Sequence, residues 1–315
     1  MAVYTHVDEK ALRAFLAPYN LAPLKHFEGI DEGISNTNYH VFFVDGSRLV
    51  LTLYEHERRL SLADVPFFLS LMRHISDKGL PCPTPIRDRH GAMTSLLCGK
   101  HAALFCFLQG TPVRVITLEH CRQVGTQLAR LHCATASLPL QRANPFDLSG
   151  WRALAEQLNP PRPMRTTINE TLARFDEGDM SLLPKGIIHA DLFPDNVFFD
   201  KETLCGIIDF YFACVDNLAY DLAITLNAWC FDDKHTLRPT YAQALLAAYD
   251  KERPLSPEER HRLPLLCQGA ALNFLLTRLQ DQQAFDHPLP DKDPQEYHNK
   301  LLFHHNHPMI ATLLP

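Results

Sequence analysis

The segment from residue 186 to residue 210 constrains the fold most, because it alternates short apolar runs with polar loops. The apolar runs at 186–188, 197–199 and 206–208 are bounded by turn residues, a pattern typical of buried strands. Polar residues at the ends of such strands are well placed for chemistry. Those of interest here are His189, Asp191, Asp195, Asn196 and Asp209.

The spacing of these polar residues indicates phosphoryl transfer. The order His-x-Asp-x-x-x-x-Asn, followed by an Asp at the end of a later strand, is the arrangement that this chemistry needs. Asp191 can accept a hydroxyl proton, while Asn196 and Asp209 can offer oxygen atoms to Mg²⁺, which prefers hard oxygen ligands and substrate phosphates. The alternative is a surface turn rich in Asp, Pro and Asn. The flanking strand pattern disfavours that alternative.

This segment resembles the catalytic loop and metal-binding Asp of the aminoglycoside-phosphotransferase-like kinases, which are distant relatives of protein kinases. The text that follows, YFACVDNLAYDLAITLNAWCF at 211–231, is similar to bacterial homoserine kinases of this superfamily. The resemblance spans most of 29–233. It implies an α+β, bilobal, protein-kinase-like fold. The expected small antiparallel-β, nucleotide-binding lobe is 1–108, and the larger, mainly helical, catalytic and substrate-binding lobe is 109–315.

The N-terminal third has the pattern expected of such a nucleotide-binding lobe. Helical spacing at 8–18 is followed by strand-like runs at 26–30, 38–44 and 48–54. The resemblance implies that the link at 31–38 covers the ATP phosphates, with Gly33, Ser35 and Asn36 as nucleotide-binding residues. A plain hairpin turn is the alternative for this link.

Two further nucleotide-binding features follow from the resemblance. Phe105 and Phe107 lie in the apolar run 102–108, where a kinase hinge would bind adenine through backbone groups. Thr52 stands where kinases place a Lys or Arg for the phosphates. A nearby cation, with Arg48 as one candidate, or the metal ion is expected to compensate for its missing charge.

The remaining elements are expected to be mostly helical. We expect a helix at 61–78 whose start Pro66 can shift, a hairpin around 88–91 and helices from residue 117 onward. A proline-rich loop is expected at 159–165. A helix at 220–229 would carry Asp221 near its positive end, and a capping box at 256–259 would open another helix. His132 is expected to be packed and hydrogen-bonded, and the histidines of 303–308 are expected to be solvated or to line a pocket, with a metal site as the sharper alternative.

Composition limits the partners. The 315 residues carry a net charge of −6 without a basic block, which argues against nucleic-acid and anionic-membrane surfaces. No apolar run is long enough to span a bilayer, and the acidic start is not typical of a secretory signal. Nine cysteines without a C-x-x-C pair are expected to be reduced thiols of a cytoplasmic protein.

The resemblance implies the reaction. It would transfer the γ-phosphoryl group of ATP, with Mg²⁺, to the side-chain hydroxyl of L-homoserine, giving O-phospho-L-homoserine in threonine biosynthesis. Asp191 would be the catalytic residue, and Asn196 and Asp209 the metal ligands. One alternative is another small-molecule kinase of the superfamily, acting on an aminoglycoside, choline or a sugar-like alcohol. A second alternative is a non-catalytic, nucleotide-binding regulatory module, which Thr52 alone supports and the intact site residues disfavour.

Overall fold

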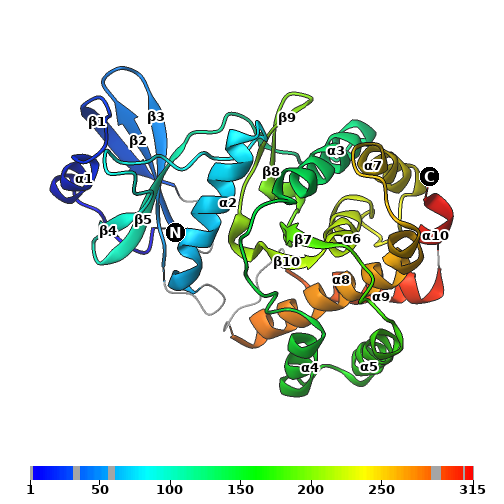
Figure 1. The fold of residues 1–315 in the computed structure, drawn as a ribbon. Helices are drawn as coiled ribbons and strands as arrows, with labels where there is room; N and C mark the ends of the chain where they lie inside the picture. Colours follow the sequence, from blue (N-terminus) through cyan, green and yellow to red (C-terminus); the bar gives the residue numbers. More distant parts are fainter. Residues whose placement is uncertain (1–2, 31–35, 56–60, 285–291, 308, 315) are drawn as a thin grey trace. The chain divides into compact units, whose positions relative to one another are not determined.

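The computed structural model describes residues 3–30, 36–55, 61–284, 292–307 and 309–314 (Figure 1). The chain divides into two compact units. The first consists of Met1–Gly110 with Cys205–Tyr211, and the second of Thr111–Leu204 with Phe212–Pro315. The boundary between residues 108 and 109 stays a prediction.

The first unit is built on a five-stranded antiparallel sheet with the order β1-β2-β3-β5-β4. Burial alternates along β2, so that Tyr39, Val41 and Phe43 enter the core beside residues of α1. The predicted small antiparallel sheet is therefore confirmed. The strands are β1 (Leu24–Gly29), β2 (Thr37–Phe43), β3 (Arg48–Leu53), β4 (Ser95–Leu97) and β5 (Lys100–Cys106).

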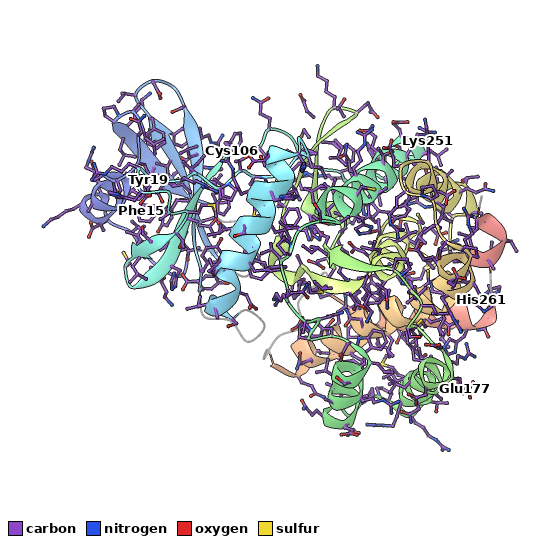
Figure 2. The ribbon with its side chains drawn as sticks, in the orientation of Figure 1. Phe15, Tyr19, Cys106, Glu177, Lys251 and His261 are labelled. Carbon is purple, nitrogen blue, oxygen red and sulfur yellow. The ribbon has the colours of Figure 1, made fainter. Side chains whose placement is uncertain are left out.

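Two helices accompany this sheet. Helix α1 (Glu9–Leu16) starts where the Asp8 carboxylate accepts a hydrogen bond from the backbone N–H of Ala11. The ring of Phe15 at its end lies 5.6 Å from that of Tyr19, and both are labelled in Figure 2. The helix expected at 61–78 begins with a 3₁₀ turn, η1 (Leu62–Asp64), and becomes α-helical as α2 (Val65–Asp77). Pro66 lies in the first turn of α2, where its missing N–H costs nothing.

The prediction of a hairpin around 88–91 is wrong. That segment is a local turn in which the Asp88 carboxylate accepts hydrogen bonds from the backbone N–H groups of His90 and Ala92. The hairpin lies further along, between β4 and β5, and turns at Cys98 and Gly99. Both residues have positive φ angles, of 51° and 76°, as a tight two-residue turn requires.

The second unit is mainly helical, as predicted. Helix α3 packs against α7, and α8 packs against α6 and α9 (Figure 1). Its helices are α3 (Leu118–Thr135), α4 (Leu148–Gln157), α5 (Arg162–Glu177), α6 (Leu218–Trp229), α7 (Pro239–Glu252), α8 (Pro257–Ala284), α9 (Pro294–Asn306) and α10 (Ile310–Leu313). The loop expected at 159–165 is too long, because α5 already begins at Arg162 and takes Pro163 into its first turn.

Short strands and 3₁₀ turns carry the polar loops of this part of the chain. Strands β7 (Lys185–Ile188) and β10 (Cys214–Asn217) form an antiparallel pair, and β6 (Thr111–Pro112) pairs with β8 (Val197–Asp200). The turn η2 (Pro194–Asn196) precedes β8. The chain enters the first unit along β9 (Thr203–Ile207) and returns through η3 (Phe210–Phe212).

All nine cysteines are free thiols, as predicted. Cys98 in the first unit and Cys133 in the second are exposed. The other seven are buried or half-buried: Cys82, Cys106, Cys121, Cys205, Cys214, Cys230 and Cys267. Over the part of the chain that the structure describes, no helix combines the length and the apolar character needed to cross a membrane.

Gly125 permits the close approach of α3 and α7. A Cβ atom there would lie 2.3 Å from the carbonyl oxygen of Leu245, and a backbone atom cannot turn aside as a side chain can. Alanine would gain about 1 kcal/mol of helix propensity, but we expect Gly125→Ala to lower the free energy of unfolding by about 1–3 kcal/mol. Urea denaturation measures this change. Thr126→Ala is the control, and unchanged stability of Gly125→Ala would contradict the prediction.

Candidate active site

The predicted catalytic loop follows β7 in the second unit. After Ile188 the chain passes through His189, which is fully buried, and Ala190, whose φ angle is +65°. A left-handed conformation at a residue other than glycine costs on the order of 1 kcal/mol and persists where neighbouring contacts hold it. The turn at Ala190 directs the chain from the buried strand to Asp191.

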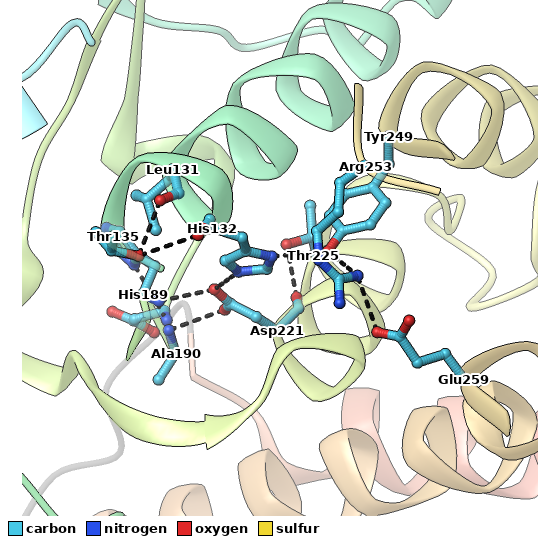
Figure 3. A network of polar contacts seen from close by, with 11 residues as sticks. Leu131, His132, Thr135, His189, Ala190, Asp221, Thr225, Tyr249, Arg253 and Glu259 are labelled. Atoms are coloured by element: carbon cyan, nitrogen blue, oxygen red, sulfur yellow. Dashed lines mark hydrogen bonds and ion pairs between the residues drawn. The ribbon is translucent and has the colours of Figure 1, made fainter. Parts of the chain in front are cut away.

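The contacts that hold this turn come from Asp221 in α6. Its carboxylate accepts hydrogen bonds from the backbone N–H of His189 at 2.7 Å and from that of Ala190 at 2.9 Å (Figure 3). Burial would raise the pKa of Asp221, but the hydrogen bond from His132 and the nearby imidazoles hold that pKa below its usual range. Asp221 therefore stays ionised and serves as a buried acceptor for the loop backbone.

Asp221 is itself fixed by a chain of polar side chains. His132 Nε2 lies 3.1 Å from its Oδ2, and His132 Nδ1 lies 2.7 Å from the Tyr249 hydroxyl (Figure 3). Arg253 donates both to that hydroxyl and to Glu259, at 3.1 and 2.9 Å. Glu259 and Ser256 exchange the two hydrogen bonds of the predicted capping box. The loop is thus tied to the N-terminus of α8.

Sequence reasoning correctly expects His132 to be packed and hydrogen-bonded, but it misses the role of Asp221. Asp221 does lie in the first turn of α6, as expected, yet its carboxylate contacts the predicted catalytic loop. The sequence did carry one signal, since Asp221 is the one charged residue in α6. A lone acid that is fully buried needs partners of its own, and here they come from other elements.

Asp191 and Asn196 lie together. Asn196 donates from Nδ2 to the Asp191 carbonyl oxygen at 2.8 Å and to its carboxylate Oδ2 at 3.1 Å. Both amide hydrogens are thereby used, so that the other amide atom, Oδ1, is the one suited to a metal ion. The backbone N–H of Asp191 donates to His189 Nδ1 at 3.2 Å, in agreement with a bracing role for His189. Asp195 is exposed beside them.

The other expected metal ligand, Asp209, belongs to the first unit. Its φ angle is +64°, a conformation that Asp tolerates better than most residues. It follows β9, and its charge raises the pKa of Tyr211 further above the rise that burial causes. A carboxylate at this point supplies the hard oxygen atoms that a divalent cation needs.

The expected nucleotide-binding residues divide into two sets. Gly33 and Ser35 lie outside the described residues. Asn36 is buried, and its Oδ1 accepts the backbone N–H of Glu55 at 3.2 Å. Glu55 in turn accepts hydrogen bonds from Thr5 and Thr37 and pairs with Lys100 at 3.1 Å. Asn36 therefore holds the backbone at Glu55, two residues after the end of β3, and Glu55 in turn contacts Lys100 of β5.

The predicted hinge residues differ in their surroundings. Phe105 lies inside β5, where Val50 of β3 is its partner, whereas Phe107 follows the end of that strand. The guanidinium of Arg48 lies 3.8 Å from the centre of the Phe107 ring, a cation–π contact. The Thr52 hydroxyl donates to Asn38 at 2.7 Å. Arg48 thus stacks on an aromatic ring. Thr52 stands at the position where kinases place a Lys or Arg, and its hydroxyl cannot supply the positive charge of such a residue.

The histidines of the C-terminal segment take part in hydrogen bonds. His304 is buried and lies 2.7 Å from Asn227 Oδ1, and His305 lies 2.9 Å from the Thr171 hydroxyl. Burial lowers the pKa of His304 to about 3, so that it is neutral at physiological pH. The described residues contain no group of three or more His, Cys, Asp or Glu side chains arranged to hold a metal ion.

Comparison with known proteins identifies the family. The profile of the phosphotransferase enzyme family matches residues 26–255, which is most of the chain. The chain belongs to this family. Within it, the chain is 48% identical to the homoserine kinase of Methylobacterium nodulans, over 96% of both chains. It is 46% identical to that of Parvibaculum lavamentivorans, with the same coverage.

Solved structures agree with this placement in the phosphotransferase enzyme family. An amicoumacin kinase in complex with AMP-PNP, Ca²⁺ and Ami superposes with a TM-score of 0.72, over 98% of this chain and 95% of that one. Its sequence identity is 16%, so the likeness concerns the fold. The predicted protein-kinase-like fold and the resemblance to the aminoglycoside-phosphotransferase-like kinases are confirmed.

The Asp221 network predicts a pH-dependent stability effect. Asp221→Asn removes the buried negative charge and replaces one of the two accepting oxygens by an NH₂ donor, so that one backbone N–H of the loop loses its acceptor. We expect it to lower the free energy of unfolding by about 3–5 kcal/mol near neutral pH. Because the folded pKa of Asp221 is depressed, its contribution is present above the unfolded value of about 4 and is lost as pH falls through the folded value.

Denaturant unfolding of wild type and variant between pH 7 and pH 3 tests this effect. The gap in stability should stay constant down to about pH 4 and narrow below it. The exposed Asp200→Asn is the matched control and should show no comparable gap. A gap for Asp221→Asn below about 1 kcal/mol at neutral pH would contradict the assigned role.

Proposed function

We propose that this protein is a homoserine kinase that transfers the γ-phosphoryl group of ATP to the side-chain hydroxyl of L-homoserine. The observation that carries the proposal is identity of 45–48% with three homoserine kinases over 96% of the chain. Identity of this extent includes the helices of the second unit and so goes beyond a shared fold. Free thiols are also in keeping with a reducing cytoplasm, where we propose that the enzyme acts.

In the proposed mechanism Asp191 is the residue that accepts the hydroxyl proton. Its carboxylate is oriented by Asn196 through Oδ2, and its backbone is fixed by His189 and by the turn at Ala190. Orientation of this kind places a base without further ordering during the reaction. The buried Asp221 keeps the loop in that conformation.

We assign Asn196 Oδ1 and the Asp209 carboxylate as the protein ligands of Mg²⁺. The donor set fits a hard cation, since Asn196 already uses its amide nitrogen on Asp191. Bound Mg²⁺ would neutralise charge that develops on the transferred phosphoryl group. Two protein ligands leave the remaining positions to phosphate and water oxygens.

For ATP we propose the 31–38 link, with Gly33, Ser35 and Asn36, and the hinge residues Phe105 and Phe107. Phe107 suits adenine binding through its backbone better than Phe105, because it follows β5 and Phe105 pairs within it. Kinases acting on other alcohols share this fold at 12–16% identity, which carries no argument about the substrate.

We expect L-homoserine to give a higher kcat/KM than L-serine and L-threonine. Asp191 fixes the position of the reacting hydroxyl, and a pocket that also holds the α-ammonium and α-carboxylate fixes its distance from Cα. Serine is one methylene too short, and a misplacement of about 1 Å can cost on the order of 10²-fold. Steady-state kinetics with choline and kanamycin as controls measure this. A higher kcat/KM for either control would overturn the substrate assignment.

Asp191→Asn tests the base directly. The substitution keeps the size of the side chain and removes the proton acceptor, so kcat should fall by about 10²- to 10⁴-fold while the affinity for ATP stays nearly unchanged. Steady-state kinetics measure kcat, and calorimetric titration measures the affinity for ATP. The exposed neighbour Asp195→Asn is the control. Turnover of Asp191→Asn close to that of wild type would show that another group accepts the proton.

A further inference from the structure

A buried cluster of charges lies where α8 meets α9. Glu296 accepts a hydrogen bond from Arg278 at 2.6 Å through one carboxylate oxygen and from Lys300 at 2.5 Å through the other. Lys300 also donates to the Asn227 carbonyl oxygen at 2.9 Å. Arg278 and Lys300 lie 4.5 and 4.6 Å from the centre of the Tyr297 ring. We call these four side chains, Arg278, Glu296, Tyr297 and Lys300, the α8–α9 charge cluster.

The cluster holds two basic side chains and one carboxylate, and burial lowers the pKa of Lys300 although the charge of Glu296 opposes that shift. Two cations share one carboxylate, and the side chains of Arg278 and Lys300 are only 10% and 6% exposed. Burial would raise the pKa of Glu296, but the two cations hold it below its usual range, so that Glu296 is ionised. A buried excess cation is costly unless a further anion pairs with it. The cluster is therefore suited to bind an anionic group.

The partners of the two cations differ. Lys300 is held by Asn227, Glu296 and two aromatic faces. Within the described residues, Arg278 makes its hydrogen bonds to Glu296 and to the Asp293 carbonyl oxygen through Nη1. The planar guanidinium can pair with a carboxylate through two parallel N–H groups, which makes Arg278 the better partner for an incoming carboxylate.

The cluster lies near the catalytic loop within the second unit. The Tyr297 ring is 6.4 Å from that of Phe193, two residues after Asp191. Burial raises the pKa of Tyr297. The charge of Arg278 opposes this rise, and the charges of Glu296, Asp191 and Asp195 add to it. The Tyr297 hydroxyl is buried and makes no hydrogen bond to any residue that the structure describes. An unmade hydrogen bond of this kind costs about 1–3 kcal/mol.

We propose that the α8–α9 charge cluster binds the amino-acid part of the substrate, with Arg278 pairing with the α-carboxylate and Glu296 with the α-ammonium. This inference rests on the proposed function. A zwitterion needs one cation and one anion held close together, and Arg278 and Glu296 are in direct contact. Glu296 is the most accessible member of the ion pairs, with a side chain 29% exposed. Lys300 donates a hydrogen bond to Glu296 and is itself held by the carbonyl oxygen of Asn227, so that Glu296 is fixed in position.

The recognition can be measured with two truncated alcohols. 4-Hydroxybutanoate lacks the ammonium of L-homoserine, and 3-aminopropan-1-ol lacks its carboxylate. We expect Arg278→Met to lower kcat/KM about 100-fold for L-homoserine and 4-hydroxybutanoate, since each loses a charge-assisted contact. For 3-aminopropan-1-ol, which has no carboxylate, the change should be less than about threefold.

Glu296→Gln should give the opposite pattern. It should lower kcat/KM for L-homoserine and 3-aminopropan-1-ol about 100-fold and affect 4-hydroxybutanoate little, because only the first two carry an ammonium. The KM for ATP should stay close to that of wild type in both variants. Arg174→Met is the matched control. Arg174 lies in α5, outside the cluster, and it also donates a hydrogen bond to a side chain of α8, that of Gln268, at 3.1 Å.

The outcomes separate this inference from the proposed function. Wild-type protein that phosphorylates L-homoserine, with an Arg278→Met variant that loses the same factor on all three alcohols and melts at a lower temperature, would show a structural ion network and overturn the inference alone. Wild-type protein inactive on L-homoserine would overturn both. If Arg278→Met does not fold, Arg278→Lys replaces it, and it should show the same selectivity with a smaller loss.

Discussion

The geometry of the proposed catalytic loop depends on two backbone hydrogen bonds to one buried carboxylate. Asp221 accepts the N–H groups of His189 and Ala190, and these contacts hold Ala190 in a left-handed conformation that it would not adopt alone. In a buried setting such hydrogen bonds are charge-assisted and rigid. The position of Asp191 therefore follows from a residue 30 positions later in the chain, on a different element.

Helix α6 links this constraint to the proposed recognition of the substrate. Asp221 near its start holds the loop, and Asn227 further along holds Lys300 through its carbonyl oxygen. Trp229 at its end donates to the carbonyl oxygen of Leu192, the residue after Asp191. The same helix therefore positions the proposed base and the charges proposed to bind the α-carbon substituents. The distance between Asp191 and the α8–α9 charge cluster would then select a substrate of matching length, because one rigid helix positions both.

The elements that sequence reasoning predicts correctly are those with local causes. The alternation along β2 and the Ser256–Glu259 capping box both depend on residues a few positions apart. The hairpin expected around 88–91 fails because the Asp88 carboxylate closes the turn locally, without flanking strands that pair. The contacts that could not be predicted join distant segments, such as His132 with Asp221 and Arg278 with Glu296. Such contacts depend on how the helices pack against one another, and a local sequence pattern does not predict that packing.

The distribution of thiols has a practical consequence. Each compact unit carries one exposed cysteine, Cys98 in the turn between β4 and β5 and Cys133 in α3. The other seven thiols are less accessible, and burial raises the pKa of several of them, including Cys82, Cys214 and Cys267, which slows their reaction with alkylating dyes. Brief labelling at neutral pH would therefore place one fluorophore on each unit of the natural sequence. Energy transfer between the two dyes would then report the distance between Cys98 and Cys133 in solution, without an introduced residue.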